Sequence, residues 1–229
     1  MKYNSRNFKT IRDLSFFCFN QITINKPLKN QIFYFILSGG TSPRTLFKMI
    51  NKDLNNNSDW GQYYFLMSDE RQVPINHQDS NLGTFIRLSG IPESQTVDIN
   101  SMHRSESKFR EIIPFDKIFE KDLIIKNAII GMGEDGHFAS IFPNDNDSLK
   151  AIKGSDRSYI CENKNITHPR ITLSLKMIAK SEKIFLLVTS AKKLAVINKK
   201  DGLPVHDLLD KLKAVSYTHL TLPTRSTVE

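Results

Sequence analysis

The sequence predicts an α/β protein with a mostly parallel β-sheet that helices cover on both faces. Short apolar segments of strand length alternate with segments whose apolar residues recur at helical spacing. Several strand-like segments end in glycine or serine turns that lead into a helix. The chain has 229 residues, 39% of them hydrophobic, so it can bury a substantial core. Together these observations are typical of parallel strands joined by helical crossovers.

The first half of the chain contains two predicted strands and two predicted helices. Residues 31–37 form an apolar, β-branched and aromatic run, which predicts a buried strand. Pro43 suits the first turn of a helix that we expect to reach about Asp53. The same patterns predict a strand at 62–67 and a short helix at 81–88.

The second half repeats this alternation of strands and helices. Residues 105–121 predict a longer helix interrupted at Pro114, and residues 123–130 predict a strand that ends in Gly131. Further strands are predicted at 171–175 and 183–189, and further helices at 192–198 and 205–213.

The domain organisation is predicted to be simple. There is no internal repeat and no long linker, so we interpret residues 1–214 as a single α/β domain. The polar segments 51–59 and 144–156 are interpreted as surface loops. Residues 216–224 lack a clear amphipathic period and resemble translated sequencing-adapter read-through. We therefore expect residues 215–229 to be a non-native or truncated tail.

Composition limits the classes of function. The net charge is +8, but the longest basic runs are the pairs 192–193 and 199–200, so the charge suits a small anionic substrate as well as nucleic acid. No apolar run is long enough to cross a bilayer, and no secretory signal follows the basic N-terminus. Cys18 and Cys161 are too few for a disulfide framework, which favours a cytoplasmic setting.

Two loops offer groups that could bind an anion or a sugar. Residues 38–43 (SGGTSP) connect a strand to a helix, and their glycines, hydroxyls and helix amides could hold a phosphate, although an ordinary tight turn remains the alternative. The ending of a Walker A loop is absent. Residues 68–71 (SDER) follow the second strand and could clamp a polyol or an anion, or form a solvated charge cluster.

A third loop carries the strongest candidate for a catalytic base. Residues 131–137 (GMGEDGH) match the spacing of a dinucleotide-binding fingerprint, but Glu134 and Asp135 would place two negative charges at the pyrophosphate. We therefore interpret the loop as a glycine-rich turn that presents His137 beside Asp135. A carboxylate near an imidazole can fix its tautomer and stabilise its protonated form.

The last candidate loop is basic. Residues 190–193 (SAKK) follow a strand and begin a helix, where a lysine opposes the helix dipole unless an anion binds there. A solvated basic turn is an equally good interpretation. Arg170, after Pro169, is a weaker candidate of the same kind.

Together these loops resemble the 6-phosphogluconolactonase family, a branch of the group that includes glucosamine-6-phosphate deaminase. The resemblance covers about residues 31–213, and its most specific part is the glycine-rich loop. The matching stretches are SGGTSPR (38–44), SDERQVP (68–74), DSNLG (79–83), GMGEDGHFASIFP (131–143) and PRITLSL (169–175).

The resemblance implies a three-layer α/β/α sandwich with a mostly parallel, Rossmann-like sheet. It also implies hydrolysis of 6-phospho-D-glucono-1,5-lactone to 6-phospho-D-gluconate in the oxidative pentose phosphate pathway. By matching position, His137 would be the general base that activates water, and Asp135 would orient it. The residues expected to hold the substrate are Gly39, Gly40, Thr41, Ser42, Asp69, Arg71, Arg170 and Lys193.

The expected ligand is a small sugar phosphate, without nucleic acid, membrane, organic cofactor or metal. Nucleophilic attack on a reactive lactone needs positioning and one base. The six histidines are dispersed along the sequence, and none pairs at the spacing of metal ligands.

The chain departs from the family pattern in three places. The lysine turn begins with Ser190 rather than glycine, which leaves open whether Lys192 or Lys193 faces the phosphate; we favour Lys193. The approach to Arg170 lacks the usual Lys-Pro-Pro run. The tail replaces the family's last strand, so we expect that strand to be absent from the sheet.

Two other functions remain as alternatives. A glucosamine-6-phosphate deaminase would continue the glycine-rich loop with Ala-Phe-Asn-Glu-Pro, whereas residues 139–143 read ASIFP and contain no acid. The deaminases also usually carry tyrosine at the position of Arg71. A non-catalytic module that binds sugar phosphates would keep the phosphate loops without turnover.

Overall fold

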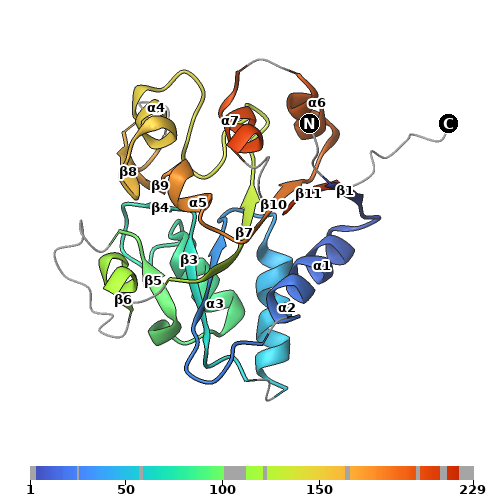
Figure 1. Cartoon of the computed structure of the whole chain (residues 1–229), viewed down its shortest axis with the longest axis vertical. Coiled ribbons are helices and arrows are strands. Elements are labelled where there is room, and N and C mark those ends of the chain that lie inside the picture. Colours follow the sequence, from blue (N-terminus) through green and yellow to red (C-terminus); the bar gives the residue numbers. More distant parts are fainter. Residues whose placement is uncertain are drawn as a thin grey trace.

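The computed structural model describes residues 4–24, 26–56, 59–100, 112–120, 123–162, 166–199, 202–211 and 216–221. Its main feature is a sheet of eight strands in the order β1-β11-β10-β7-β2-β3-β5-β6, in which every pair is parallel (Figure 1). The strands are β1 (Asn4–Asn7), β2 (Phe33–Leu37), β3 (Tyr63–Met67), β5 (Thr96–Asp98), β6 (Ile113–Pro114), β7 (Ile125–Gly131), β10 (Lys183–Val188) and β11 (Ser216–Thr221).

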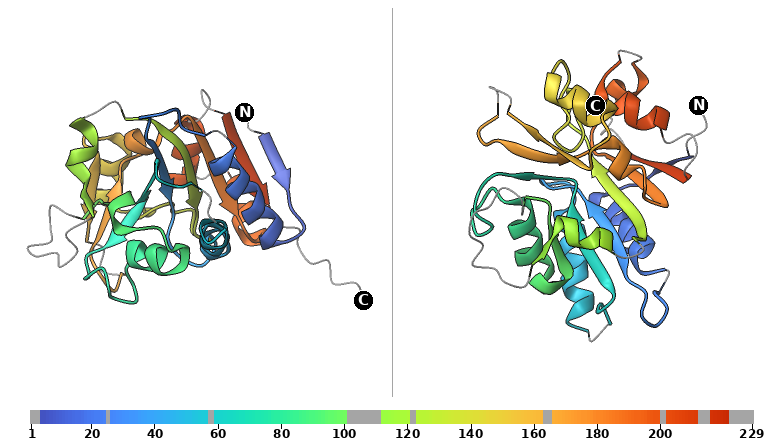
Figure 2. Two further views of the ribbon diagram at one scale, coloured as in Figure 1. Left: turned by 90° about the horizontal axis from the view of Figure 1, so that it is seen from below. Right: turned by 60° about the vertical axis from the view of Figure 1, so that its left-hand side comes forward.

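Helices cover both faces of this sheet, which confirms the predicted α/β/α class. They form two layers, one on each side of the sheet (Figure 2). The first layer contains α1 (Ile11–Thr23), α2 (Arg44–Leu54) and α3 (Asn81–Ser89). The second contains α4 (Asn146–Lys153), α5 (Leu175–Ile178), α6 (Ala191–Asn198) and α7 (Pro204–Lys211).

Alternation along the strands divides the core between the two layers. In β2, Phe33, Phe35 and Leu37 pack with α1, α2 and α3, whereas Tyr34 and Ile36 point to the opposite face. All five side chains of β2 are buried. A strand that is apolar on both faces is typical of a parallel sheet between two helical layers, because neither face meets water.

A second, smaller sheet lies beside the main one and is antiparallel. It has the order β4-β9-β8, with β4 (Asp69–Arg71), β8 (Ser158–Cys161) and β9 (Arg170–Leu173). Asp69 pairs with Thr172, and Arg71 pairs with Arg170. The small sheet therefore brings together two polar segments that are about 100 residues apart in the sequence.

The predicted strands at 31–37, 62–67, 123–130 and 183–189 are confirmed as β2, β3, β7 and β10, with bounds shifted by one or two residues. The helices predicted from Pro43, at 81–88, 192–198 and 205–213 are confirmed as α2, α3, α6 and α7, although residues 212–213 lie outside the described residues. The predicted strand at 171–175 is β9, which belongs to the small antiparallel sheet.

Three expectations were wrong. Within the predicted helix at 105–121, residues 105–111 and 121 lie outside the described residues, while Ile113–Pro114 is strand β6 and Phe115–Glu120 is a 3-10 helix. Pro114 is accommodated because β6 is an edge strand. The loop expected at 144–156 contains α4, whose first turn is capped by Asp145, which accepts from the Ser148 amide at 2.8 Å.

The third correction concerns the end of the chain. Residues 216–221 form β11, which pairs in parallel with β10 on one side and β1 on the other. The expected absence of a last strand is therefore wrong.

Helix α1 was not predicted, although a local signal for it exists. Thr10 caps the helix by accepting a hydrogen bond from the Asp13 amide, and Asp13 in turn accepts from the Thr10 amide. This reciprocal arrangement is a capping box.

Among the described residues, no helix has the length and apolarity needed to cross a membrane. Cys18 and Cys161 are both buried free thiols.

Candidate active site

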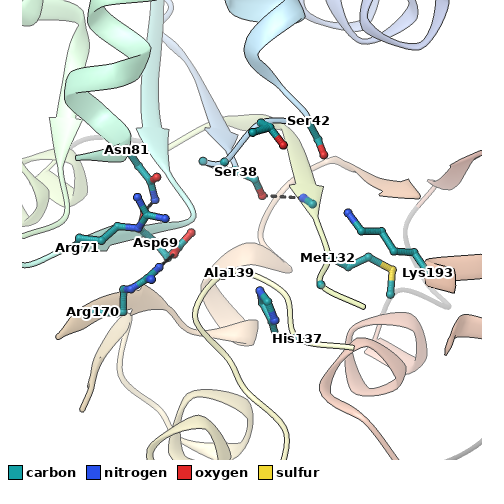
Figure 3. A pocket seen from close by; sticks show the side chains of 15 residues that line it. Ser38, Ser42, Asp69, Arg71, Asn81, Met132, His137, Ala139, Arg170 and Lys193 are labelled. Carbon is teal, nitrogen blue, oxygen red and sulfur yellow. Dashed lines mark hydrogen bonds and ion pairs between the residues drawn. The ribbon is translucent and has the colours of Figure 1, made fainter. Parts of the chain in front are cut away.

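The carboxyl ends of four parallel strands surround a cavity of about 280 Å³. The loops after β2, β3, β7 and β10 each contribute lining residues (Figure 3). In the sheet, β2 lies between β3 and β7. The chain runs from β2 outward through β3 and β5 to one edge and then returns to β7 on the other side of β2, so the direction of strand order reverses at the cavity. Ligands of open parallel sheets bind at such switch points.

The loop after β2 lines the cavity with backbone rather than with bulky side chains. Gly40 has φ +80°, a conformation that favours glycine. A side chain on Gly39 would collide with Asn81, which lies about 2 Å from the position of its Cβ. Ser38 Oγ accepts a hydrogen bond from the Gly131 amide at 2.7 Å and so joins the ends of β2 and β7. Helix α2 begins without a side-chain cap, so amides of its first turn could donate to an anion.

His137 and Asp135 form a close pair in the loop after β7. His137 Nδ1 lies 2.6 Å from Asp135 Oδ1, and the two side chains are 33% and 50% exposed. The turn is closed by the Gly133 amide, which donates to the His137 carbonyl at 2.8 Å. A Cβ on Gly133 would lie 2.3 Å from the His137 ring and 2.4 Å from Asp135 Oδ1. The pair therefore depends on glycine at position 133.

The opposite wall contains a buried carboxylate. Asp69 is only 6% exposed and accepts hydrogen bonds from Ser68 Oγ at 3.1 Å and Ser140 Oγ at 2.7 Å. Arg170 Nη1 lies 3.7 Å from Asp69 Oδ2. This carboxylate is therefore already engaged by protein groups, and it orients Arg170 in the cavity wall.

Arg71 and Arg170 each reach the cavity with unused hydrogen-bonding capacity. Arg71 Nη1 donates to the Asp79 carbonyl. The Nε atoms of both arginines are buried without a hydrogen-bond partner among the described residues. Burial, followed by the nearby charge of Arg71, lowers the pKa of Arg170. Two close guanidinium groups with unpaired donors are suited to an anionic ligand.

Glu70, between Asp69 and Arg71, has a structural role. Its carboxylate is fully buried and accepts hydrogen bonds from Ser80 Oγ, the Asn81 amide and the Leu82 amide at 2.8 to 3.0 Å. It thereby satisfies free donors at the start of α3. This leaves Asp69 and Arg71 as the residues of the SDER loop that line the cavity.

Lys193 is the lysine of the basic turn that lines the cavity. Its Nζ donates to Thr189 Oγ1 at 3.1 Å, and burial lowers its pKa, with Glu134 acting in the opposite direction. Lys192 instead points to solvent, with its side chain 80% exposed and its Nζ 3.7 Å from Glu134. In Figure 3, Lys193 lies on one side of His137, and Arg71 and Arg170 lie on the other.

The structure brings the sequence-predicted residues to one place. Nine of the ten line the cavity. The tenth, Asp135, does not line it but contacts the Nδ1 atom of His137. Sequence reasoning did not name six further residues that line the cavity. The only signal for them in the sequence is that they lie within the motifs that carry the named residues. They are Ser38, Asn81, Gly131, Met132, Gly133 and Ala139.

The fold also brings together three metal-ligating side chains that sequence spacing did not reveal. His77, Asp79 and His168 each offer a ligand atom, and these atoms lie within 4.8 Å of one another. His77 and Asp79 are two residues apart, but His168 is distant in the sequence and adjacent only in the folded chain.

Comparisons with known proteins identify the family of this chain. A family model described as Glucosamine-6-phosphate isomerases/6-phosphogluconolactonase matches residues 21–206. The chain is 28% identical to the 6-phosphogluconolactonase of Pseudomonas aeruginosa over 71% of this chain and 69% of that protein. It is also 28% identical to the 6-phosphogluconolactonase of Haemophilus influenzae over 75% of both chains. The match spans 56% of the probable chloroplastic 6-phosphogluconolactonase 4 of Oryza sativa.

Solved structures share the fold. The structure of 6-phosphogluconolactonase from Leishmania guyanensis superposes with a TM-score of 0.79 at 19% identity, covering 97% of each chain. A putative 6-phosphogluconolactonase from Neisseria gonorrhoeae gives 0.75 at 23% identity, covering 97% of this chain and 100% of that one. With the family model matching most of the sequence, this chain belongs to the Glucosamine-6-phosphate isomerases/6-phosphogluconolactonase family.

Proposed function

We propose that this chain is a 6-phosphogluconolactonase, which hydrolyses 6-phospho-D-glucono-1,5-lactone to 6-phospho-D-gluconate in the oxidative pentose phosphate pathway. The family membership and the names of the relatives support the reaction. The observation that carries the proposal is the His137–Asp135 pair, with its 2.6 Å contact, on the wall of a cavity lined by three cationic side chains.

His137 is the general base in this proposal. Donation of its Nδ1 proton to Asp135 leaves Nε2 unprotonated and able to accept a proton from water. The water oxygen attacks the lactone carbonyl carbon and its proton passes to Nε2. When the tetrahedral intermediate collapses, the ring C–O bond breaks, and the imidazolium returns a proton to the leaving ring oxygen. Asp135 stabilises the imidazolium between the two steps.

The cationic groups bind and orient the substrate. Lys193 and the hydroxyls of Thr41 and Ser42 would hold the phosphate beside the first turn of α2, where helix amides also favour an anion. Arg71 and Arg170 would contact the oxygens at the other side of the cavity. Asp69 acts through Arg170, because protein donors already occupy its two oxygens.

The backbone after β2 is suited to the oxyanion of the intermediate. Gly39 and Gly40 carry no side chain, so a reacting carbonyl can approach their amides closely. Positioning by the cations and one base is sufficient for a lactone ester, which is already reactive. The proposal therefore invokes no step through a metal or an organic cofactor.

The test is hydrolysis of freshly generated 6-phosphogluconolactone, followed in a pH-stat and corrected for spontaneous opening. Wild type should accelerate the reaction, and His137→Ala should lower kcat by on the order of a hundredfold or more. Circular dichroism and thermal melting of both proteins establish that the variant is folded. Equal rates for the two proteins, both above background, would contradict His137 as the base.

The same assay separates the alternative functions. No acceleration by folded wild type would refute the lactonase, and ammonia release from glucosamine 6-phosphate would then identify a deaminase. Tight binding of 6-phosphogluconate without turnover of either substrate would identify a binding module.

A further inference from the structure

His77, Asp79 and His168 form a compact cluster outside the proposed catalytic machinery. His77 and Asp79 lie in the loop between β4 and α3, and His168 lies two residues before β9. His168 Nε2 is 3.1 Å from Asp79 Oδ2, and His77 Nδ1 is 3.8 Å from the same oxygen. The two imidazole rings are edge to face, with centroids 5.4 Å apart.

The donor set and its spacing match a zinc ion. Zinc is commonly held by imidazole nitrogens and carboxylate oxygens in a tetrahedron, which places neighbouring ligand atoms about 3.3 Å apart. The two contacts with Asp79 Oδ2, at 3.1 and 3.8 Å, are close to this value, and all three ligand atoms lie within 4.8 Å of one another, so side-chain rotations could bring them to three corners of a tetrahedron. Two histidines and one carboxylate leave the fourth corner for water.

The cluster is accessible to an ion from solvent. The side chains of His77, Asp79 and His168 are 38%, 44% and 27% exposed. The Asp79 amide donates to His77 Nδ1 at 3.1 Å, which keeps that nitrogen unprotonated and its lone pair directed at the loop. A metal bound through Nδ1, the atom that lies 3.8 Å from Asp79 Oδ2, would replace this hydrogen bond.

The position of the cluster couples it to the arginine wall of the cavity. The Asp79 carbonyl accepts from Arg71 Nη1, and the Gln72 amide donates to the Pro169 carbonyl at 2.8 Å. Asp79 also lines a smaller cavity of about 180 Å³ that shares Gly39, Gly40 and Arg71 with the main one. An ion here would therefore link the loop after Arg71 to the segment before Arg170.

We propose that His77, Asp79 and His168 form a zinc-binding site that fixes the two arginine-bearing segments relative to each other. The site is structural, since the ion holds the wall and takes no part in the attack on the lactone. The competing explanation is a simple ion pair between protonated His168 and Asp79, which needs no metal.

The test uses the full chain, stripped with a chelator and titrated with Zn²⁺ by calorimetry, with the visible bands of Co²⁺ as a second probe. The variants are His77→Gln and His168→Gln. His137→Gln is the matched control, because His137 also forms a close histidine–carboxylate pair, with Asp135. Circular dichroism of each apo protein establishes folding.

We expect wild type and His137→Gln to bind one equivalent of zinc. Both cluster variants should bind at least tenfold more weakly and lose the Co²⁺ bands. Zinc should also raise the Tm of wild type and His137→Gln, but not that of His168→Gln, because an ion that binds only the folded state stabilises it. Unchanged zinc affinity in both cluster variants, loss only in His137→Gln, or wild-type binding in the millimolar range or weaker would each overturn the proposal.

Discussion

The two walls of the cavity are built in different ways. The His137 wall is a single turn, in which the histidine, its carboxylate partner and the closing Gly133 all lie within five residues. The arginine wall joins β4 to β9, and its buried carboxylate Asp69 is held by Ser140 from a third segment. The first wall is local and half-exposed, and the second is long-range and buried.

This difference separates the requirements for catalysis from those for stability. A local turn at the surface contributes little to the free energy of folding, so a change there should lower activity more than stability. A buried hydrogen-bonded carboxylate leaves its donors unpaired when it is altered, so a change there should lower both. The comparison therefore predicts that substitutions in the His137 wall lower mainly activity, whereas substitutions in the arginine wall lower both activity and stability.

Among the variants that leave His137 itself unchanged, the largest effect on catalysis is expected from Gly133→Ala. The new Cβ would lie within 2.4 Å of the His137 ring and Asp135, so the pair must move. Displacement of a catalytic group by about 1 Å can reduce rate by on the order of a hundredfold, which is the loss in kcat that we expect. Urea denaturation should show little change in the free energy of unfolding.

Gly61→Ala provides the control for this variant. Position 61 is exposed, and an added Cβ would meet only Asp59 Oδ1, at 3.3 Å. We expect wild-type kcat from this variant. A Gly133→Ala protein with normal kcat would show that the turn tolerates the extra atom and that the pair is not held as tightly as we infer.

Asp69→Asn, in the arginine wall, should in contrast cause a clear loss of stability. The amide keeps the size of the side chain but removes the charge beside Arg170 and one of the two acceptor oxygens. We expect the free energy of unfolding to fall by about 2 kcal/mol. Asp116→Asn, which alters an exposed ion pair with Arg157 at 4.0 Å, should change it by no more than about 0.5 kcal/mol. Equal effects in the two variants would contradict the buried network.

The same contrast explains what could be predicted from the sequence. Strands β2, β3, β7 and β10 are apolar runs, and the glycine turn after β7 displays Asp135 and His137 in one motif, so local pattern was sufficient. The pairing of β4 with β9, the donation of Ser140 to Asp69 and the meeting of His77 with His168 depend on chain segments that only the fold brings together. Sequence reasoning could name these residues but not their partners.

Local sequence patterns also misled the interpretation of two elements. Helix α4 is a polar segment whose only buried side chains are Ser148 and Ala151, so it was interpreted as a loop. In the segment before β7, Pro114 belongs to an edge strand, where pairing with β5 overrides the helical pattern. Propensity failed in these places because tertiary contacts decided the structure.

A smaller effect is expected from the two neighbouring lysines. Lys193→Ala should raise the Kd for 6-phosphogluconate by roughly tenfold, because a charge-assisted hydrogen bond in the cavity is lost. Lys192→Ala should leave this Kd unchanged, since Lys192 is 80% exposed and pairs only with the exposed Glu134. Calorimetry with the product avoids the spontaneous opening of the lactone. The opposite ranking of the two variants would assign the phosphate contact to Lys192.

The smallest expected effect is a pH dependence of product binding. Burial lowers the pKa of Lys193, so its ammonium loses its proton at a lower pH than an exposed lysine does. Only the protonated form attracts the phosphate, so the Kd should rise severalfold as the pH is raised above neutral, and the rise should begin at a lower pH than for an exposed lysine. Lys193→Arg should abolish this rise, because a guanidinium stays charged over that range. A rise that persists in Lys193→Arg would mean that another titrating group controls the Kd. The phosphate contact would then have to be assigned to a residue other than Lys193.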